Sequence, residues 1–153
     1  MLKNNGEDKE GRKSFMNILI VDGQGGQLGA RLVTEVLARV PDAALTAVGT
    51  NAAATAAMMK AGARSAATGE NPVVVACRRA DVIIGPIGIV IADSLLGEVT
   101  PDIAVAVGQA DAVRILIPMN KCENLVAGVS GSNTAALIAD AMAKLEAVIA
   151  ADC

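Results

Sequence analysis

Asn17-Ile18-Leu19-Ile20-Val21-Asp22 runs directly into Gly23-Gln24-Gly25-Gly26-Gln27-Leu28-Gly29, and these two stretches decide the fold. The first is an apolar run typical of a buried strand, and the second is a glycine-rich turn. An amphipathic helical pattern follows over residues 28–40. A strand, a glycine turn and a helix start together form the phosphate-binding corner of nucleotide-binding α/β folds.

The spacing G-x-x-G-x-x-G, with a further glycine at 25, predicts a structural role for each glycine. Gly23 lets the chain turn away from the strand, and Gly29 lets the helix lie close to it. Gly25 and Gly26 leave backbone N–H groups bare for a pyrophosphate, which the positive end of the helix dipole also attracts. The alternative is a tight turn that binds nothing. The predicted cofactor-binding residues of this loop are Gly23, Gln24, Gly25, Gly26, Gln27, Leu28 and Gly29.

Two features depart from the usual dinucleotide-binding pattern. Asp22 places a negative charge before the first glycine, where it either caps the N–H groups of the loop or binds a metal–phosphate complex; we favour the cap. No Asp or Glu follows the second predicted strand, where NAD-binding proteins hold the ribose hydroxyls. Neutral Thr50 and Asn51 stand there instead, and no arginine adjoins them. We predict that both contact the cofactor, and the choice between NAD and NADP stays open.

Strand and helix patterns alternate from residue 17 onward, which predicts an α/β fold. The predicted strands are 17–22, 44–48, 64–68, 81–84, 113–117 and a short sixth at 125–129, and the predicted helices are 28–40, 52–61, 73–80, 103–110 and 133–150. Thr50 or Asn51 is the expected N-cap of the second helix, Asn71 before Pro72 that of the third, and Thr100 that of the fourth. The expected architecture is a doubly wound, mostly parallel sheet of five or six strands, Rossmann-like, with right-handed crossovers.

Length and composition indicate one domain. The chain has 153 residues, of which 53% are hydrophobic, a composition that suits a sheet covered on both faces. Residues 1–15 are polar and aperiodic, so we interpret them as a disordered tail or as the product of an upstream start codon before a true start at Met16. Residues 16–153 are predicted to form a single Rossmann-like nucleotide-binding domain.

Charge and cysteine usage exclude several classes of partner. The net charge of −3 and the scattered basic residues argue against nucleic acid. The longest uncharged apolar run, residues 82–92, is interrupted by Gly85-Pro86 and is too short to span a membrane. Cys77, Cys122 and Cys153 have no metal-type spacing, so we predict free thiols in a reducing cytoplasm and no bound metal.

The loops at the carboxyl ends of the strands share one edge of the sheet and define one predicted site. The loop after the fourth strand adds cofactor contacts from Gly85, Pro86, Ile87 and Gly88, and the candidate substrate pocket comprises Glu70, Asn71, Asn120, Lys121 and Cys122. The chain has no His, Tyr or Trp, so a histidine or tyrosine catalyst is excluded and the reaction is left unassigned. We therefore favour an ordinary thiol for Cys122. The apolar stretch 87–96 either covers the sheet or forms a subunit interface, and we expect a homo-oligomer.

Two resemblances accompany these motifs. The loop Gly23-x-x-Gly26-Gln27-Leu28-Gly29 is similar to the cofactor loop of extended short-chain dehydrogenases, which implies pyrophosphate contacts, but their catalytic Tyr and Lys pair is missing. The runs 21–26, 47–51, 67–71, 83–92 and 115–118 resemble a family of short bacterial proteins whose domain has no known function. This second resemblance implies a Rossmann-like fold and no established activity.

Taken together, these features predict a cytoplasmic protein that binds a small-molecule nucleotide, with NAD or NADP as first candidate. It would act as an oxidoreductase or as a sensor. The alternative is a non-catalytic module that binds a small anion or assembles into an oligomer. We expect neither nucleic acid nor membrane as a partner.

Overall fold

One parallel sheet organises the computed structural model, which describes residues 15–119, 124–131 and 133–152. Its five strands lie in the order β3-β2-β1-β4-β5, and every neighbouring pair is parallel. The strands are β1 (Asn17–Asp22), β2 (Ala44–Gly49), β3 (Ser65–Thr68), β4 (Val82–Pro86) and β5 (Val113–Ile117). This order and the helical crossovers confirm the predicted Rossmann-like α/β fold.

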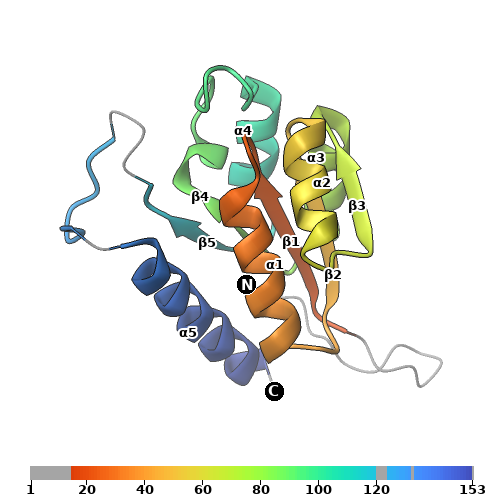
Figure 1. Cartoon of the computed structure of the whole chain (residues 1–153), viewed down its shortest axis with the longest axis vertical. Helices are drawn as coiled ribbons and strands as arrows, with labels where there is room; N and C mark the ends of the chain where they lie inside the picture. The colour runs from red at the N-terminus through yellow and green to blue at the C-terminus, as the bar shows by residue number, and fades with distance from the viewer. Residues whose placement is uncertain (1–14, 120–123, 132, 153) are drawn as a thin grey trace.

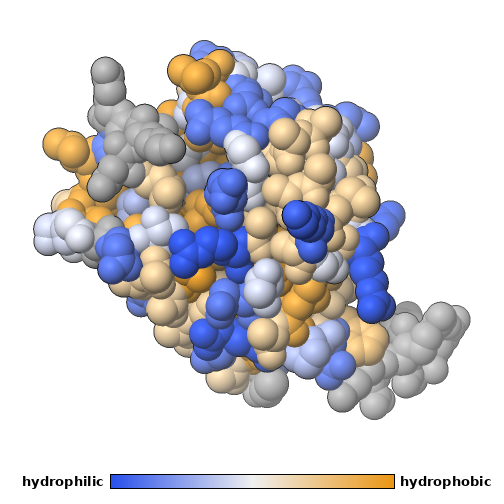
Figure 2. Space-filling model, viewed as in Figure 1, coloured by the Kyte–Doolittle hydropathy of each residue, from blue (hydrophilic) through white to orange (hydrophobic). Residues whose placement is uncertain are grey.

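Helices cover both faces of the sheet (Figure 1). One face carries α1 (Gln27–Arg39), α2 (Ala52–Lys60) and α5 (Thr134–Asp152); the other carries α3 (Glu70–Cys77), the short 3-10 helix η1 (Ile87–Val90) and α4 (Pro101–Gln109). Hydrophilic side chains lie over the outer surface of α1 in the middle of Figure 2. None of the described helices is long and apolar enough to cross a membrane.

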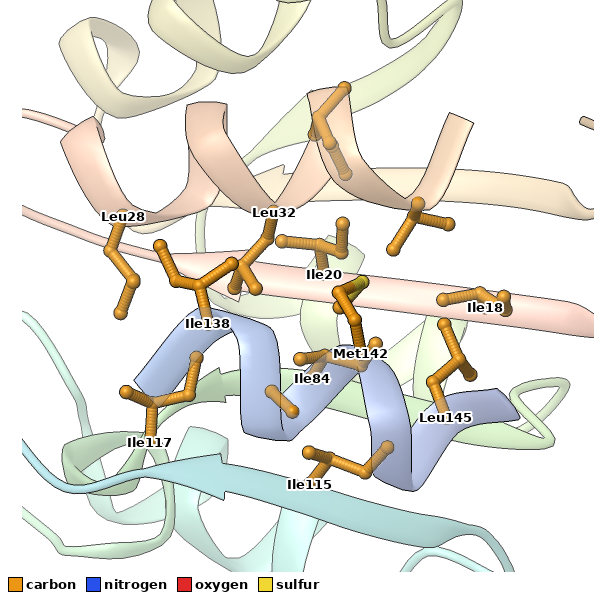
Figure 3. Packing of buried hydrophobic residues seen from close by; sticks show 14 of the residues in the cluster. Ile18, Ile20, Leu28, Leu32, Ile84, Ile115, Ile117, Ile138, Met142 and Leu145 are labelled. Atoms are coloured by element: carbon orange, nitrogen blue, oxygen red, sulfur yellow. The ribbon is translucent and has the colours of Figure 1, made fainter. Parts of the chain in front are cut away.

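The position of β1 in the centre of the sheet explains why its sequence is apolar without alternation. Ile18 and Ile20 belong to the core on the α1 side, while Leu19 and Val21 belong to the core on the α4 side. A strand buried on both faces has no polar side, so an unbroken apolar run is its sequence pattern. Figure 3 shows Met142 of α5 between that helix and β1, in the core on the α1 side.

Of the three helix N-caps predicted above, two are confirmed and one is wrong. Asn51 caps α2, since its Oδ1 accepts the Ala54 N–H at 2.9 Å, and Thr100 caps α4 by accepting the Ile103 N–H at 3.2 Å. The prediction that Asn71 caps the third helix is wrong. That helix begins at Glu70, after Gly69 with a φ of 108°. Pro72 therefore lies within the first turn, where its missing N–H removes no helical hydrogen bond.

The predicted sixth strand at 125–129 is also wrong. These residues form a turn in which the Val129 N–H donates to the Val126 carbonyl, and Gly128 has a φ of 86°. Leu125 is fully exposed, so its apolar side chain does not join the core. Of the tail predicted at 1–15, residues 1–14 lie outside the described residues, and Phe15 is half exposed.

Candidate functional site

The strand order reverses between β1 and β4, and the loops that follow these two strands diverge at this point. Ligands of open α/β sheets bind in the crevice that such a divergence creates. A cavity of about 150 Å³ occupies it here. Its lining residues are Asp22, Gly23, Gln24, Gly25, Gly26, Gln27, Leu28, Pro86, Ile87, Gly88, Leu95 and Met119.

Asp22 lies at the inner side of the glycine loop and is 6% exposed. Its Oδ1 accepts the Gly23 N–H at 2.8 Å, and its Oδ2 accepts the Gly29 N–H at 2.6 Å. Asp22 therefore caps the loop and the first turn of α1, as we expected. Burial raises the pKa of this carboxyl, while the hydrogen bonds from Gly29 and Gly23 act in the opposite direction.

Three glycines of the site serve close packing. A Cβ on Gly26, whose φ is 72°, would lie 2.6 Å from the Ala54 Cα of α2. A Cβ on Gly29 would lie 2.8 Å from the Cβ of Asp22, which supports the predicted close approach of helix and strand. Gly85 lies in β4, next to β1 in the sheet, and a Cβ there would come 2.3 Å from the Val21 carbonyl oxygen. None of these positions has room for a larger residue.

The N–H groups of the loop divide into paired and unpaired sets. Gly26 donates to the Gly23 carbonyl at 3.0 Å, so the prediction of a bare N–H at Gly26 is wrong. Among the described residues, no acceptor faces the N–H groups of Gly25, Gln27 and Leu28. Gly25 is exposed, and a Cβ added there would meet the Gln27 Cγ at 3.8 Å, an ordinary van der Waals contact. These three donors lie at the N-terminus of α1, where the helix dipole attracts anions.

Glu98, in the loop between η1 and α4, contacts the glycine loop next to the cavity lining, and the sequence did not indicate it. Its Oε1 accepts the Thr50 hydroxyl at 3.0 Å and also the side-chain amide of Asn51. The Gln24 N–H is shared by both carboxylate oxygens, at 3.1 and 3.2 Å. Glu98 thus joins the loops that follow β1 and β2. No motif or spacing marks a contact across 48 residues of sequence.

The hydrogen bonds around Glu98 also set its charge. Partial burial alone raises the pKa of this carboxyl, but the bonds from Asn51, from the Gln24 N–H and from Thr50 outweigh it. The net effect lowers the pKa, so Glu98 is ionised at neutral pH. An ionised carboxylate therefore stands at the carboxyl end of β2.

Of the predicted substrate-pocket residues, none that the structure describes lies in the lining of the cavity. Glu70 and Asn71 lie in the first turn of α3, away from the lining of the cavity, and Glu70 accepts a hydrogen bond from Thr100. Asn120, Lys121 and Cys122 lie outside the described residues. Met119 and Leu95 line the cavity without having been predicted.

The stretch 87–96 is partly buried. Ile89 is fully buried, as a sheet-covering segment requires, whereas Leu96 is 97% exposed. The hydrophobic atoms at the top of Figure 2 lie over this loop between η1 and α4. The segment therefore combines core packing with an exposed apolar tip.

Neither metal binding nor a reactive thiol is indicated in the described parts of the chain. No group of three metal-ligating side chains is present among them. Cys77 is buried, and burial raises its pKa to about 11, so the thiol stays protonated at neutral pH.

Comparison with known proteins identifies the family. A family model described as "Domain of unknown function (DUF3842)" matches residues 17–150, so the chain belongs to this family. No curated protein matches it. Among solved structures, it is similar to a dodecameric FMN-dependent UbiX-like decarboxylase from Escherichia coli O157:H7, with 17% identity and a TM-score of 0.40, over 87% of this chain and 76% of that one. A likeness this weak carries no conclusion about a ligand.

Proposed function

We propose that this member of the DUF3842 family binds a nucleotide cofactor in the crevice between β1 and β4, with NAD(P) as first candidate. The observation that supports the proposal best is the set of three N–H groups, at Gly25, Gln27 and Leu28, that have no acceptor among the described residues. They lie beside a cavity at the point where the strand order reverses. These groups would donate hydrogen bonds to the pyrophosphate oxygens.

The charges around the loop favour a pyrophosphate diester over a terminal phosphate. Asp22 already compensates part of the helix dipole, and Glu98 adds a second negative charge nearby. Each phosphate of a dinucleotide carries one negative charge, whereas a terminal phosphate carries about −1.5 to −2 at pH 7. The terminal group would therefore meet the stronger repulsion.

The apolar part of the cavity suits a ring system. Leu28, Ile87, Leu95 and Met119 lie on its wall, and they would pack against a base or a nicotinamide without stacking aromatics. A bound NAD(P) would itself supply hydride chemistry. Asp22, the ionisable residue in the lining, is already engaged by two N–H groups, so the site fits a sensor as well as an oxidoreductase.

A second candidate is a module that binds a small anion or assembles into an oligomer. The cavity volume of about 150 Å³ favours the small anion, because pockets for drug-sized ligands typically span about 300–1,000 Å³. The exposed tip at Leu96 favours assembly. We infer a homo-oligomer in the cytoplasm under either function.

Titration calorimetry on ligand-free protein tests the proposal, with NAD, NADH, NADP, NADPH, FMN, AMP and inorganic pyrophosphate as probes. Gly25→Asp places a negative charge beside the unpaired N–H groups, and Gly25→Asn places a neutral side chain of the same size there. We expect Asp to weaken dinucleotide binding at least about tenfold more than Asn, a difference of about 1.4 kcal/mol. Gly108→Asp is the matched control, at an exposed glycine where an added Cβ would meet no atom within 4 Å.

The outcomes separate the candidates. Binding of a dinucleotide that the Gly25→Asp variant loses supports the proposed cofactor site. Binding of pyrophosphate with no binding of any nucleotide supports the small-anion module instead. Failure of every probe to bind the wild-type protein would remove the nucleotide function.

A further inference from the structure

The carboxylate of Glu98 lies where NAD-binding folds hold the adenosine ribose. In those folds an acidic residue near the end of the second strand accepts hydrogen bonds from the ribose hydroxyls. This chain has Thr50 and Asn51 after β2, and the side chains of both donate to Glu98. The acid that is missing from the local sequence is therefore supplied by a distant loop.

Resting on the proposed nucleotide function, we infer that Glu98 accepts the ribose 2′-hydroxyl and makes the site select NAD(H) over NADP(H). Thr50 and Asn51 then act as positioning residues that hold Glu98 rather than as direct contacts with the ribose. The choice that the sequence left open is decided by this one side chain.

The two oxygens of Glu98 have different surroundings. Oε1 accepts hydrogen bonds from Thr50, from Asn51 and, at 3.1 Å, from the Gln24 N–H. Among the described residues, Oε2 accepts a hydrogen bond only from the same Gln24 N–H, at the longer distance of 3.2 Å. A carboxylate oxygen offers about two lone-pair positions. Oε1 thus anchors the side chain, while Oε2 keeps capacity for a ribose hydroxyl.

The charge of Glu98 would exclude a phosphorylated ribose. In the described part of the chain, no Lys or Arg forms an ion pair with it. Its lowered pKa keeps it ionised at neutral pH. A 2′-phosphate placed against this carboxylate would meet a like charge with no cation between them.

The loop that carries Glu98 is held in a defined shape. The Asp93 N–H donates to the Val99 carbonyl at 2.7 Å, and the Ser94 hydroxyl donates to the Gly88 carbonyl. Leu95 and Leu96 adopt positive φ angles of 55° and 57°, which non-glycine residues rarely adopt unless the surroundings enforce it. A loop held this firmly presents the carboxylate without a large ordering cost on binding.

The test is the ratio of dissociation constants for NADP and NAD, measured by calorimetry on the full chain. We expect the wild-type protein to bind NAD at least about tenfold more tightly, Glu98→Gln to lose most of that preference, and Glu98→Lys to prefer NADP. Glu146→Gln, which removes one negative charge on α5, should keep the wild-type ratio. Thermal unfolding checks that each variant is folded.

Two results would overturn the inference while leaving the proposed function in place. One is a wild-type protein that binds NADP at least as tightly as NAD. The other is a folded Glu98→Gln variant that keeps the full NAD preference. Absence of binding to both NAD and NADP would also overturn the inference, and the proposed function would fall with it only where FMN and AMP fail to bind as well.

Discussion

The inner and outer sides of the glycine loop differ in what their polar groups and glycines contact. On the inner side, Asp22, Gly26 and Gly29 contact the protein itself, through hydrogen bonds and close backbone packing. On the outer side, the N–H groups of Gly25, Gln27 and Leu28 have no acceptor among the described residues, and Gly25 and Gln27 are exposed. A glycine motif therefore mixes structural positions with positions available to a ligand, and sequence spacing alone does not separate them.

Alanine at Gly26 and at Gly25 should show the largest contrast between the two sides. At Gly26 the new Cβ would lie 2.6 Å from the Ala54 Cα, and the φ of 72° adds about 1–2 kcal/mol of backbone strain. Together with overpacking of about 1–3 kcal/mol, we expect a loss of about 3 kcal/mol. Gly25→Ala should change the free energy of unfolding by less than about 0.5 kcal/mol. Urea denaturation measures both; equal losses would contradict the division of the loop.

Asp22→Asn should have the next largest effect on stability. The asparagine side chain has one acceptor oxygen, so its NH₂ group would face the N–H of Gly23 or Gly29. A buried donor left without an acceptor costs about 1–3 kcal/mol. Urea denaturation at pH 7 measures this loss, and a variant as stable as wild type would show that the cap is dispensable.

The two carboxylates should respond to pH in opposite directions. The pKa of Asp22 is raised from its ordinary 3.8, so the folded state favours the protonated carboxyl. Its contribution to stability is therefore fully present below pH 3.8 and is lost as the pH rises through the pKa of the folded state. The pKa of Glu98 is lowered from 4.5, so its contribution is present above 4.5 and is lost as the pH falls through its folded value.

Urea denaturation between pH 3 and 7 checks this contrast. The stability difference between wild type and Asp22→Asn should shrink as the pH rises. The difference between wild type and Glu98→Gln should grow as the pH rises. If the two stability differences changed in the same direction with pH, the opposite pKa shifts of Asp22 and Glu98 would be contradicted.

Gln27→Ala should have the smallest effect. Gln27 is exposed at the first position of α1, and its backbone N–H, not its side chain, is the proposed donor. We expect less than about 0.5 kcal/mol in stability and less than about threefold in nucleotide affinity, which calorimetry would measure. A large loss of affinity would show that the side chain of Gln27, and not its backbone N–H, contacts the nucleotide.

Local patterns predicted the fold well because the central strands are buried on both faces. The apolar runs of β1 and β4 and the caps at Asn51 and Thr100 depend on neighbouring residues alone. The prediction of a sixth strand was wrong because Leu125 and Val129 are exposed in a turn. The prediction of a cap at Asn71 was wrong because that helix begins at Glu70, directly after Gly69.

The features that sequence reasoning missed depend on long-range contacts. Gly26 is restricted by the backbone of α2, and its N–H is paired within the loop turn. Glu98 reaches the site from a loop 74 residues beyond Gln24. Local spacing carries no information about either contact, so only the tertiary arrangement distinguishes the inner from the outer side of the loop.

The central claim is that the outer N–H groups bind the phosphates of a nucleotide. Two-dimensional ¹H–¹⁵N NMR during a titration with NAD observes these groups directly. We expect the resonances of Gly25, Gln27 and Leu28 to shift together and saturate at one dissociation constant, with smaller shifts at the paired N–H groups of Gly26 and Gly29. Unchanged resonances at all three outer positions, at NAD concentrations up to several millimolar, would contradict the claim.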